Sequence, residues 1–345
     1  MIQVDETYEE TTWLNGVNKE AMDELLSSKG FCPTGPGGGV DPTCGTGGPK
    51  TLRSGEVMHP ASRGKDGVWR NEKGEPHPDH IQKLKFPPSF SKDGKPNPKA
   101  PVGVHVNLNP DGDLLASFKN TKGKTVPIYS ANHTMTAAAD KFARVRELRK
   151  KRQEIFSEID ADLDGEHSEE AAVLKLVMKT GMRPGSDEDT GADYKSYGAT
   201  TLEGRHVIEK AGVVVIRFVP GKKKGQEIEM PIHDESLGEA LLKRAKAAGE
   251  EGRLFDTDAG KLRKYSKTKD GGGFKTKDHR TALGTELAIE SIKKQAPPKS
   301  MAEYKKRTKE IATEVSVVLG NTPLIAIKDY IDPQVWVSWK AKVGA

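Results

Sequence analysis

Apolar and polar positions recur with two different periods along the chain, and the change of period divides it into regions. Between Val68 and Tyr129, short apolar runs alternate with turn signals. The runs VHVNL and LLASF flank NPDGD, a turn sequence typical of a β-hairpin, and NTKG marks a second turn shortly afterwards. The pattern therefore predicts a small, mainly β domain over residues 66–135.

After Asn132 the apolar positions take the helical period, beginning with TAAADKFARVRELRKKRQEIFSEI. Start and stop signals predict further helices at residues 168–180, 237–248, 280–295 and 300–319. One β insertion, HVIEKAGVVVIRFVPGKKKGQEIEMPI, interrupts them and predicts two or three strands with a lysine-rich turn. Together these elements predict an α+β protein whose second domain, residues 136–345, is mostly α-helical with a β-hairpin insertion.

The first 65 residues follow neither period. Their stretch FCPTGPGGGVDPTCGTGGPK consists mostly of Gly, Pro and Thr, a composition that does not bury enough apolar surface for a packed core. We therefore expect residues 1–65 to form a flexible tail.

Near the C-terminus, the stretch LGNTPLIAIKDYIDP contains a helix stop followed by a second, shorter helical pattern. Gly320 ends the long helix, and Leu324, Ile327 and Ile331 then recur at helical spacing. Tyr330 falls off this apolar face, beside charged neighbours. The spacing alone thus predicts a tyrosine at the surface.

The formal net charge of +5 conceals an asymmetry. Residues 1–50 hold eight acidic and three basic residues, a net of −5, whereas residues 51–345 hold 42 acidic and 52 basic residues, a net of +10. The body of the chain is therefore more basic than the total, which favours a polyanionic partner.

Two cysteines, Cys32 and Cys44, are too few for a disulfide framework or a four-cysteine zinc site and indicate a reducing compartment. No apolar run approaches the roughly 18 residues of a membrane-spanning helix. The acidic N-terminus also lacks the pattern of a signal peptide. We therefore expect a soluble, intracellular protein.

The stretch DADLDGEHSEEA begins like a calcium-binding EF-hand loop, with Asp160, Asp162 and Asp164 at ligand positions. Its twelfth position, which needs a bidentate Glu, is Ala171. The sequence therefore favours a plain acidic loop between helices, and it predicts no metal site.

Four stretches carry side chains suited to phosphoryl chemistry. Arg183 follows a helix stop, Lys222 lies in the turn FVPGKKKGQ, Arg280 opens a helix, and Tyr330 lies near Asn321. Paired guanidiniums can hold the charge that builds on the oxygens of an attacked phosphodiester. A tyrosine can be the nucleophile and a lysine the general acid. Singly, each residue has an ordinary surface or packing role, so only the set indicates chemistry.

In their order along the chain these stretches resemble the type IB DNA topoisomerases. TGMRPGSD and YGATTLEGRHV resemble the segment of the first catalytic arginine, and FKTKDHRTALGT resembles that of the second. LGNTPLIAIKDYIDP resembles the tyrosine segment of bacterial members. Upstream, NEKGEPHPDHIQKLKFPPSF and NLNPDGDLLASFKNTKGK resemble the small DNA-clamping domain of that group, and the similarity extends from about residue 68 to 340.

The resemblance implies the catalytic fold shared with tyrosine recombinases and a reaction without ATP, metal or cofactor. Tyr330 would attack a phosphodiester of double-stranded DNA, giving a 3′-phosphotyrosyl link and a free 5′-hydroxyl. Arg183 and Arg280 would hold the transition-state oxygens, and Lys222 would protonate the leaving 5′-oxygen. Swivelling of the free end would relax positive and negative supercoils before the strand is resealed.

The lysine-rich turn departs from the family pattern, which places Gly-Lys directly after a strand. Here Pro220 intervenes and three lysines follow Gly221. Lys222 directly follows that glycine, while Lys223 and Lys224 stay open as alternatives for the general acid.

Four residues are expected to contact DNA: Tyr129, Lys141, Arg144 and Lys277. Bacterial members have a Tyr-Arg-Tyr run where this chain has Pro-Ile-Tyr, so only Tyr129 is kept. The helix over residues 134–152 is rich in Lys and Arg, which predicts either a solvated face or a surface that contacts phosphates.

Asn321 stands where viral and eukaryotic members typically have a histidine that donates to a non-bridging oxygen. Bacterial members with the same Leu-Gly-Asn-Thr-Pro sequence have asparagine at this position. An amide can donate the same bond but stays neutral. The resemblance therefore implies a catalytic Asn321.

Two other functions are compatible with this set. A tyrosine recombinase shares the catalytic fold, but recombinases favour His-x-x-Arg where this chain has Lys277-x-x-Arg280, and their arm domain is typically helical. The second alternative function is that of a DNA-binding protein without catalytic activity, and the intact Tyr330 argues against it.

The resemblance further implies a monomer that clamps the duplex and is not bound to a membrane. Such an enzyme acts at the nucleoid of a bacterium or, if encoded by a virus or phage, in the host cell.

Overall fold

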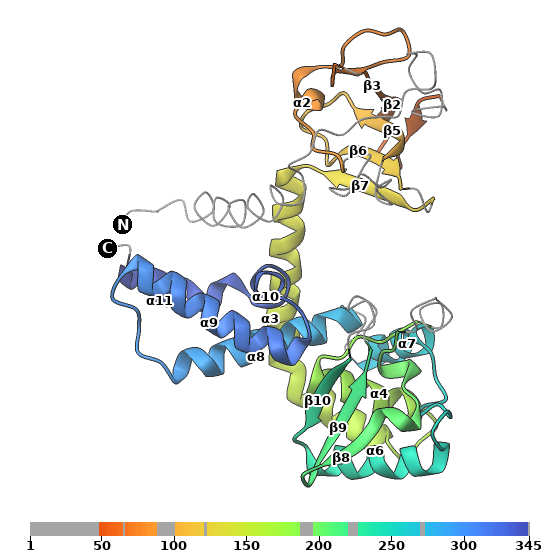
Figure 1. Cartoon of the computed structure of the whole chain (residues 1–345), viewed down its shortest axis with the longest axis vertical. Coiled ribbons are helices and arrows are strands. Elements are labelled where there is room, and N and C mark those ends of the chain that lie inside the picture. The colour runs from red at the N-terminus through yellow and green to blue at the C-terminus, as the bar shows by residue number, and fades with distance from the viewer. Residues whose placement is uncertain are drawn as a thin grey trace. The chain divides into compact units, whose positions relative to one another are not determined.

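The computed structural model describes residues 48–64, 66–87, 101–120, 123–186, 196–219, 227–269 and 273–343. The chain divides into two compact units, Met1–Ala139 and Asp140–Ala345 (Figure 1). The boundary falls within one long helix, α3 (Ala131–Asp162). The α+β class predicted from the sequence is confirmed.

The first unit is built on an antiparallel five-stranded sheet with the strand order β1-β2-β5-β6-β7. Its strands are β1 (Lys50–Thr51), β2 (Val57–Pro60), β5 (Val102–Asn107), β6 (Leu114–Lys119) and β7 (Thr125–Tyr129). A ribbon of β3 (Ser62–Arg63) and β4 (Trp69–Arg70) and the short helix α2 (Asp79–Gln82) accompany the sheet. The hairpins predicted at NPDGD and NTKG are the β5–β6 and β6–β7 pairs.

The core of this unit forms around a buried tryptophan. Trp69 is 2% exposed and its ring centroid lies 4.5 Å from that of Phe86, which in turn lies 5.8 Å from that of Phe118. Val104 and Val106 of β5 close the same cluster. Alternate positions of β6 point into this core, as the period of two predicts.

The sheet extends further toward the N-terminus than the predicted boundary at residue 65. β1 pairs with β2, and β2 pairs with β5 through Met58↔Asn107 and Pro60↔His105. Both residues of β1 are exposed, and the strand is held in the sheet by main-chain pairing with β2. Because neither side chain is buried, the sequence of this strand shows no alternation of apolar and polar residues. The Gly/Pro-rich stretch through residue 47, with both cysteines, lies outside the described residues.

The second unit contains most of α3 and seven further α-helices of the described chain. They are α4 (Ser168–Thr180), α6 (Glu235–Ala248), α7 (Ala259–Lys269), α8 (Thr276–Lys293), α9 (Met301–Leu319), α10 (Pro323–Tyr330) and α11 (Val337–Val343). Three short 3-10 turns are η1 (Ala199–Thr201), η2 (Gly204–His206) and η3 (Pro333–Trp336). The insertion forms an antiparallel sheet, β10-β9-β8, from β8 (Val207–Lys210), β9 (Val213–Phe218) and β10 (Ile228–Ile232).

Helix ends follow from local sequence. The predicted α4 is confirmed at both ends, and Gly181 ends it in the left-handed region at φ 66°. Ser300 caps α9 by accepting a hydrogen bond from the Glu303 N–H, and Gly320 ends it at φ 59°. The sequence missed α7, because within its eleven residues only Leu262, Tyr265 and Ser266 are buried.

Of the acidic stretch at residues 160–171, only residues 163–167 form a loop between helices, whereas Asp160 and Asp162 lie in the last turn of α3. These two carboxylates bind cations and a hydroxyl. Asp160 pairs with Lys175 at 2.9 Å, and Asp162 pairs with Lys269 at 2.5 Å and accepts a hydrogen bond from Tyr265 at 2.7 Å. These contacts dock α7 and α4 against the end of α3.

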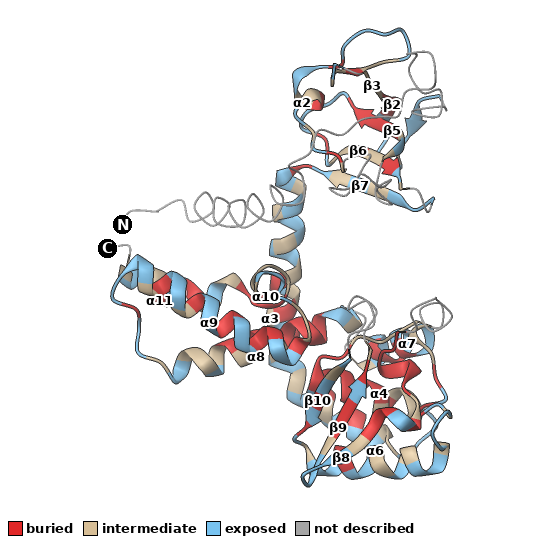
Figure 2. Cartoon of the chain, in the orientation of Figure 1, coloured by how far each residue is buried: buried red, intermediate tan, exposed pale blue. Residues whose placement is uncertain are grey.

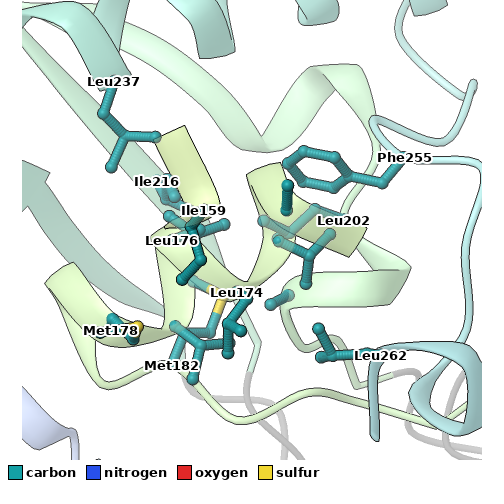
Figure 3. Packing of buried hydrophobic residues seen from close by; sticks show 14 of the residues in the cluster. Ile159, Leu174, Leu176, Met178, Met182, Leu202, Ile216, Leu237, Phe255 and Leu262 are labelled. Carbon is teal, nitrogen blue, oxygen red and sulfur yellow. The ribbon is translucent and has the colours of Figure 1, made fainter. Parts of the chain in front are cut away.

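Two hydrophobic clusters make up the core of the second unit. The larger joins α3, α4, α6, α7 and the three-stranded sheet, with Ile159, Leu174, Leu202 and Phe255 in its interior (Figure 3). The smaller joins α8, α9, α10 and α11 around Tyr304 and Trp339. In Figure 2, buried positions are concentrated on α4 and α8, whereas α6 is mostly exposed or intermediate.

In the part of the chain that the structure describes, no individual helix has both the length and the apolar character needed to cross a membrane. α9 and α10 meet those criteria only as a pair, and they are bent by 88° at the break between them. That bend returns the chain toward α8, and it brings the segment after Gly320 into the site described next.

Candidate active site

Arg183 lies in the segment that follows the left-handed end of α4. That segment is held by the η1 turn: the Ala199 N–H donates to the Arg183 carbonyl at 2.8 Å, and the Thr200 N–H donates to the Pro184 carbonyl at 2.7 Å. The Thr200 hydroxyl donates to the same Pro184 carbonyl at 2.8 Å. The Gly-Ala-Thr-Thr run thus fixes the main-chain carbonyls of Arg183 and of the proline that follows it.

The close approach between η1 and the Arg183 segment requires two glycines. A Cβ on Gly198 would lie 2.4 Å from the Gly185 nitrogen and 2.7 Å from the Arg183 carbonyl oxygen. Gly185 itself has φ +95°, a conformation that side chains other than glycine rarely adopt. The two backbones therefore approach more closely than any side chain would permit, which places the Arg183 segment against η1.

Arg280 lies in the first turns of α8 and is 4% exposed. One terminal nitrogen donates to the Gly181 carbonyl and the other donates to the Leu319 carbonyl. A guanidinium has five N–H donors, so three are left for other acceptors. Arg280 therefore joins the end of α4, the start of α8 and the end of α9 and still has donors to spare.

Tyr330 lies directly beside this guanidinium. The Arg280 Cζ is 4.8 Å from the Tyr330 ring centroid, and Tyr330 is 4% exposed. The prediction that Tyr330 falls off the buried face of its helix is therefore wrong. The buried positions of α10 are Ala326 and Tyr330, while Leu324 is 36% exposed.

The cause lies on α8, where two small residues receive the Tyr330 backbone. A Cβ on Gly284 would lie 2.7 Å from the Tyr330 carbonyl oxygen and 3.2 Å from the Tyr330 Cβ. The Thr285 hydroxyl has the Thr281 carbonyl as its nearer acceptor at 2.9 Å, also lies 3.3 Å from the Tyr330 carbonyl oxygen, and accepts from the Asp332 N–H at 3.1 Å. Gly284 and Thr285 thereby turn the tyrosine inward, and sequence reasoning missed both. Spacing cannot detect them, because they act on a segment more than forty residues away.

The electrostatics of the phenol reflect opposing causes. Burial raises the pKa of Tyr330, but the charges of Arg280 and Arg183 and hydrogen bonds from both guanidiniums outweigh it, so the pKa lies below its ordinary value of 10.0. Burial lowers the pKa of Arg280 in turn, and Arg183 adds to this while Tyr330 opposes it. The two arginines and the tyrosine thus form one coupled group.

Asn321 directly follows the left-handed Gly320, and its N–H donates to the Ser316 carbonyl at 3.0 Å. Its side-chain Nδ2 and Oδ1 are shielded from solvent and have no hydrogen-bond partner among the described residues. Leaving a buried amide unpaired costs free energy, which an incoming acceptor would recover. The sequence prediction of a donor at this position is compatible with that geometry.

Two lysines flank the tyrosine. The Lys277 Nζ lies 5.6 Å from the Tyr330 ring centroid, and Lys277 is exposed. The Lys141 Nζ donates to the Asp329 carbonyl at 3.3 Å. Burial lowers the pKa of Lys141 and the nearby Lys277 charge adds to this, while Asp329 and Tyr330 act in the opposite direction. Of the four residues predicted to contact DNA, these two lie in the site.

The other two have different surroundings. Arg144 pairs with Asp278 at 2.7 Å rather than pointing freely to solvent. Tyr129 belongs to the first unit, where it is 48% exposed and its ring stacks on His133 at 4.5 Å. Lys222 and its alternatives lie outside the described residues. The structure thus brings together Arg183, Arg280 and Tyr330 of the predicted catalytic set, and Asn321 lies two residues after Leu319, whose carbonyl Arg280 binds.

This arrangement suits the transfer of a phosphoryl group to the phenol. Two guanidiniums favour the phenolate and offer donors to phosphate oxygens, and the unpaired amide of Asn321 follows the end of α9 that Arg280 binds. The site also lies where the two hydrophobic clusters of the second unit meet, because Arg280 binds main-chain carbonyls at the ends of α4 and α9. Rigid helices on both sides hold the reacting groups.

The chain is similar in sequence to known DNA topoisomerases. A family model described as the eukaryotic DNA topoisomerase I catalytic core matches residues 130–335, more than half of the chain. A protein named DNA topoisomerase 1B from Acanthamoeba polyphaga mimivirus is 24% identical over 275 residues, which cover 73% of this chain and 77% of the relative. The matched region includes every residue of the site described above.

We expect the pKa of Tyr330 to rise when either arginine is neutralised. In a difference titration at 295 nm between the wild type and Tyr330→Phe, the midpoint should fall below 10, because two cations favour the phenolate over the phenol. Arg280→Gln and Arg183→Gln should each move the midpoint upward. Arg263→Gln, at an exposed position of α7, should leave it unchanged. An unperturbed midpoint in the wild type would contradict the coupling.

We expect Gly284→Ala to destabilise the protein, the reverse of the usual effect within a helix. Alanine normally stabilises a helix interior by about 0.5–1 kcal/mol relative to glycine. Here the new methyl group would lie 2.7 Å from the Tyr330 carbonyl oxygen, and overpacking of this kind costs about 1–3 kcal/mol. Urea unfolding should therefore show a net loss of stability, and a gain would show that α10 does not depend on Gly284.

Proposed function

The chain belongs to the type IB DNA topoisomerases, and from that premise we propose that it relaxes supercoiled DNA through a covalent tyrosine intermediate. The observation that carries the proposal is the pair of guanidiniums on Tyr330, which lower the pKa of its phenol in a buried site. The substrate is double-stranded DNA, to which the basic body of the chain, with a net charge of +10 over residues 51–345, is complementary.

In the first step, the Tyr330 phenol gives its proton to solvent water and its oxygen attacks the phosphorus of one strand. The new phosphorus–oxygen bond forms as the bond to the 5′-oxygen breaks, which leaves a 3′-phosphotyrosyl link and a free 5′-hydroxyl. Arg183, Arg280 and Asn321 stabilise the charge on the non-bridging oxygens. Lys222, or one of the two lysines after it, gives the 5′-oxygen its proton.

The strand with the free 5′ end then rotates about the intact strand and reduces the torsional strain. Attack of the 5′-hydroxyl on the phosphotyrosine reverses the first step and restores both the strand and the phenol. The bond energy is conserved in the covalent link, so the cycle needs no ATP, and the protein's own cations supply the charge stabilisation. We propose that residues 66–135, with Tyr129 at the end of β7, contact the duplex as a clamp.

The second candidate function is site-specific strand exchange by a tyrosine recombinase, which would use the same chemistry. The observation that separates the two is Lys277, which lies over the Tyr330 ring where recombinases favour a histidine. The β unit upstream of α3 also differs from the helical arm typical of recombinases. Both observations favour the topoisomerase.

We expect the wild type to relax positively and negatively supercoiled plasmid in EDTA without ATP. Tyr330→Phe should abolish relaxation and leave DNA binding nearly intact, because it removes the nucleophilic oxygen and keeps the ring. The measurement is gel electrophoresis of plasmid topoisomers beside a filter-binding assay. Full activity of Tyr330→Phe would refute the assignment. A wild type that relaxes nothing and exchanges strands between two defined sites would establish the recombinase.

We expect Asn321→His to retain relaxation activity, because histidine can donate the same hydrogen bond to the phosphate. Asn321→Ala should slow relaxation on the order of ten- to a thousandfold, the range for losing one transition-state donor. The rates should be compared under single turnover, with enzyme in excess over plasmid. An unchanged rate in the alanine variant would remove Asn321 from the catalytic set.

A further inference from the structure

Helix α3 carries a series of cationic side chains that pair with carboxylates of α8 and of the tyrosine segment. Arg144 makes two bonds to Asp278, at 2.7 Å from Nε and 3.3 Å from Nη2. The Asp278 side chain is 3% exposed. This is the bidentate geometry of a strong Arg–carboxylate pair. It uses the Nε and Nη2 donors with which the guanidinium would otherwise bind a DNA phosphate.

Asp278 is itself part of the start of α8. Its Oδ2 accepts a hydrogen bond from the Lys275 N–H at 2.9 Å, which closes the first turn of the helix. The same turn carries Lys277 and leads to Arg280. Arg144 therefore fixes the part of α8 that places cations around the Tyr330 ring.

A second pair holds the chain just after the tyrosine. The Arg146 Nη1 lies 2.8 Å from Asp332 Oδ2, and the Asp332 side chain is 3% exposed. The other oxygen of Asp332 accepts from the Gln334 N–H at 3.0 Å, and the Asp332 N–H donates to Thr285. Together with Lys141, which donates to the Asp329 carbonyl, α3 contacts the main chain or side chain of the residues on both sides of Tyr330.

The series continues along α3 away from the site. Arg149 and Arg152 pair with Glu286 of α8 at 3.7 and 3.2 Å, and the Arg152 Nη2 donates to the Met178 carbonyl at 2.6 Å. Arg152 also lies in line with the buried stripe Val145, Leu148, Ile155 and Ile159. The arginines of this helix thus bind other helices of the same unit, which removes them from the fully solvated face that a charge run normally predicts.

Two carboxylates with 3% exposure depend on these cations. Removing one partner of a buried pair leaves an uncompensated charge, which the segment relieves by shifting toward water. Such a shift would move the start of α8 or the turn after Tyr330. Catalysis is sensitive to displacements of this size, since misplacement by about 1 Å can cost on the order of 100-fold in rate.

We propose that Arg144 and Arg146 are positioning residues, which hold Tyr330 and the α8 cations in register through Asp278 and Asp332 and do not bind DNA phosphates. This inference rests on the proposed function, because it concerns the geometry of the same tyrosine. It differs from the sequence prediction, in which Arg144 contacts DNA.

The test is a double-mutant cycle of Arg144→Gln and Asp278→Asn, with three measurements on each variant. The first is the single-turnover rate of plasmid relaxation at saturating enzyme. The second is DNA affinity against salt concentration, measured in a Tyr330→Phe background so that no strand is cut. The third is the pH at which the relaxation rate reaches half its maximum. Lys246→Gln, at an exposed position of α6, is the control for loss of one positive charge.

We expect each single variant to relax plasmid about 10- to 100-fold more slowly, with DNA affinity and its salt slope unchanged. The double variant should be no slower than the slower single variant, because both changes disable one pair. The half-maximal pH should rise, since a displaced Arg280 no longer favours the phenolate. Arg144→Lys, which keeps the charge but not the fork, should give an intermediate rate. If a single variant does not fold, the double variant is compared with the wild type by the same three measurements, because it leaves no unpaired buried charge.

Direct DNA contact predicts a different set of results. Arg144→Gln would then weaken binding and reduce the salt slope by about 0.9 for the lost phosphate contact, with an unchanged rate at saturation. Asp278→Asn would bind DNA as well as the wild type or better and would relax it at the normal rate. Either result overturns the inference and leaves the proposed function intact. A wild type that forms no covalent adduct overturns the proposed function and the inference with it.

Discussion

The guanidinium of Arg280 is the contact on which the rest of the site depends. It donates to the carbonyl that ends α4 and to the carbonyl that ends α9, and its own helix begins between these two in the chain. Both acceptors are orphan carbonyls of the kind that every helix end leaves without an internal partner. A single buried cation therefore satisfies two helix ends, joins the two hydrophobic clusters and stands beside the phenol of Tyr330.

Helix α3 also combines a packing role with contacts to the site. Its apolar stripe packs into the larger cluster, while its arginines cross to α8 and to the segment after Tyr330. Buried ion pairs add little net stability over well-packed apolar residues, because desolvation offsets most of the Coulomb attraction. Their value lies in geometry: a bidentate pair fixes distance and orientation in a way that leucines do not. A site that must hold a phenol between two guanidiniums needs that kind of restraint.

Some local sequence signals in this chain specify structure, and others do not. Local capping was reliable: α4 ends at Gly181 and α9 begins after Ser300, as the residues predict. Charge patterning predicted either a solvated face or a phosphate-contacting face on the basic helix, and it carried no sign that buried carboxylates such as Asp278 pair with its arginines. Helical spacing gave the wrong buried face for α10, which contains Tyr330, because the packing of neighbouring helices determines which side of an eight-residue helix is buried. Gly284 and Thr285 left no sequence signal, because their partner is distant in the chain.

The sequence by itself determined the period of each region, the ends of α4 and α9, the α+β class, and the order in which Arg183, Lys222, Arg280, Asn321 and Tyr330 follow one another along the chain. These are properties of short segments, and neighbouring residues suffice to specify them. Only the tertiary structure decided that Tyr330 is buried, that Arg280 joins three segments, and that Arg144 faces Asp278. Those outcomes depend on close approach between segments far apart in the chain, which small residues such as Gly198 and Gly284 permit and which no local pattern encodes.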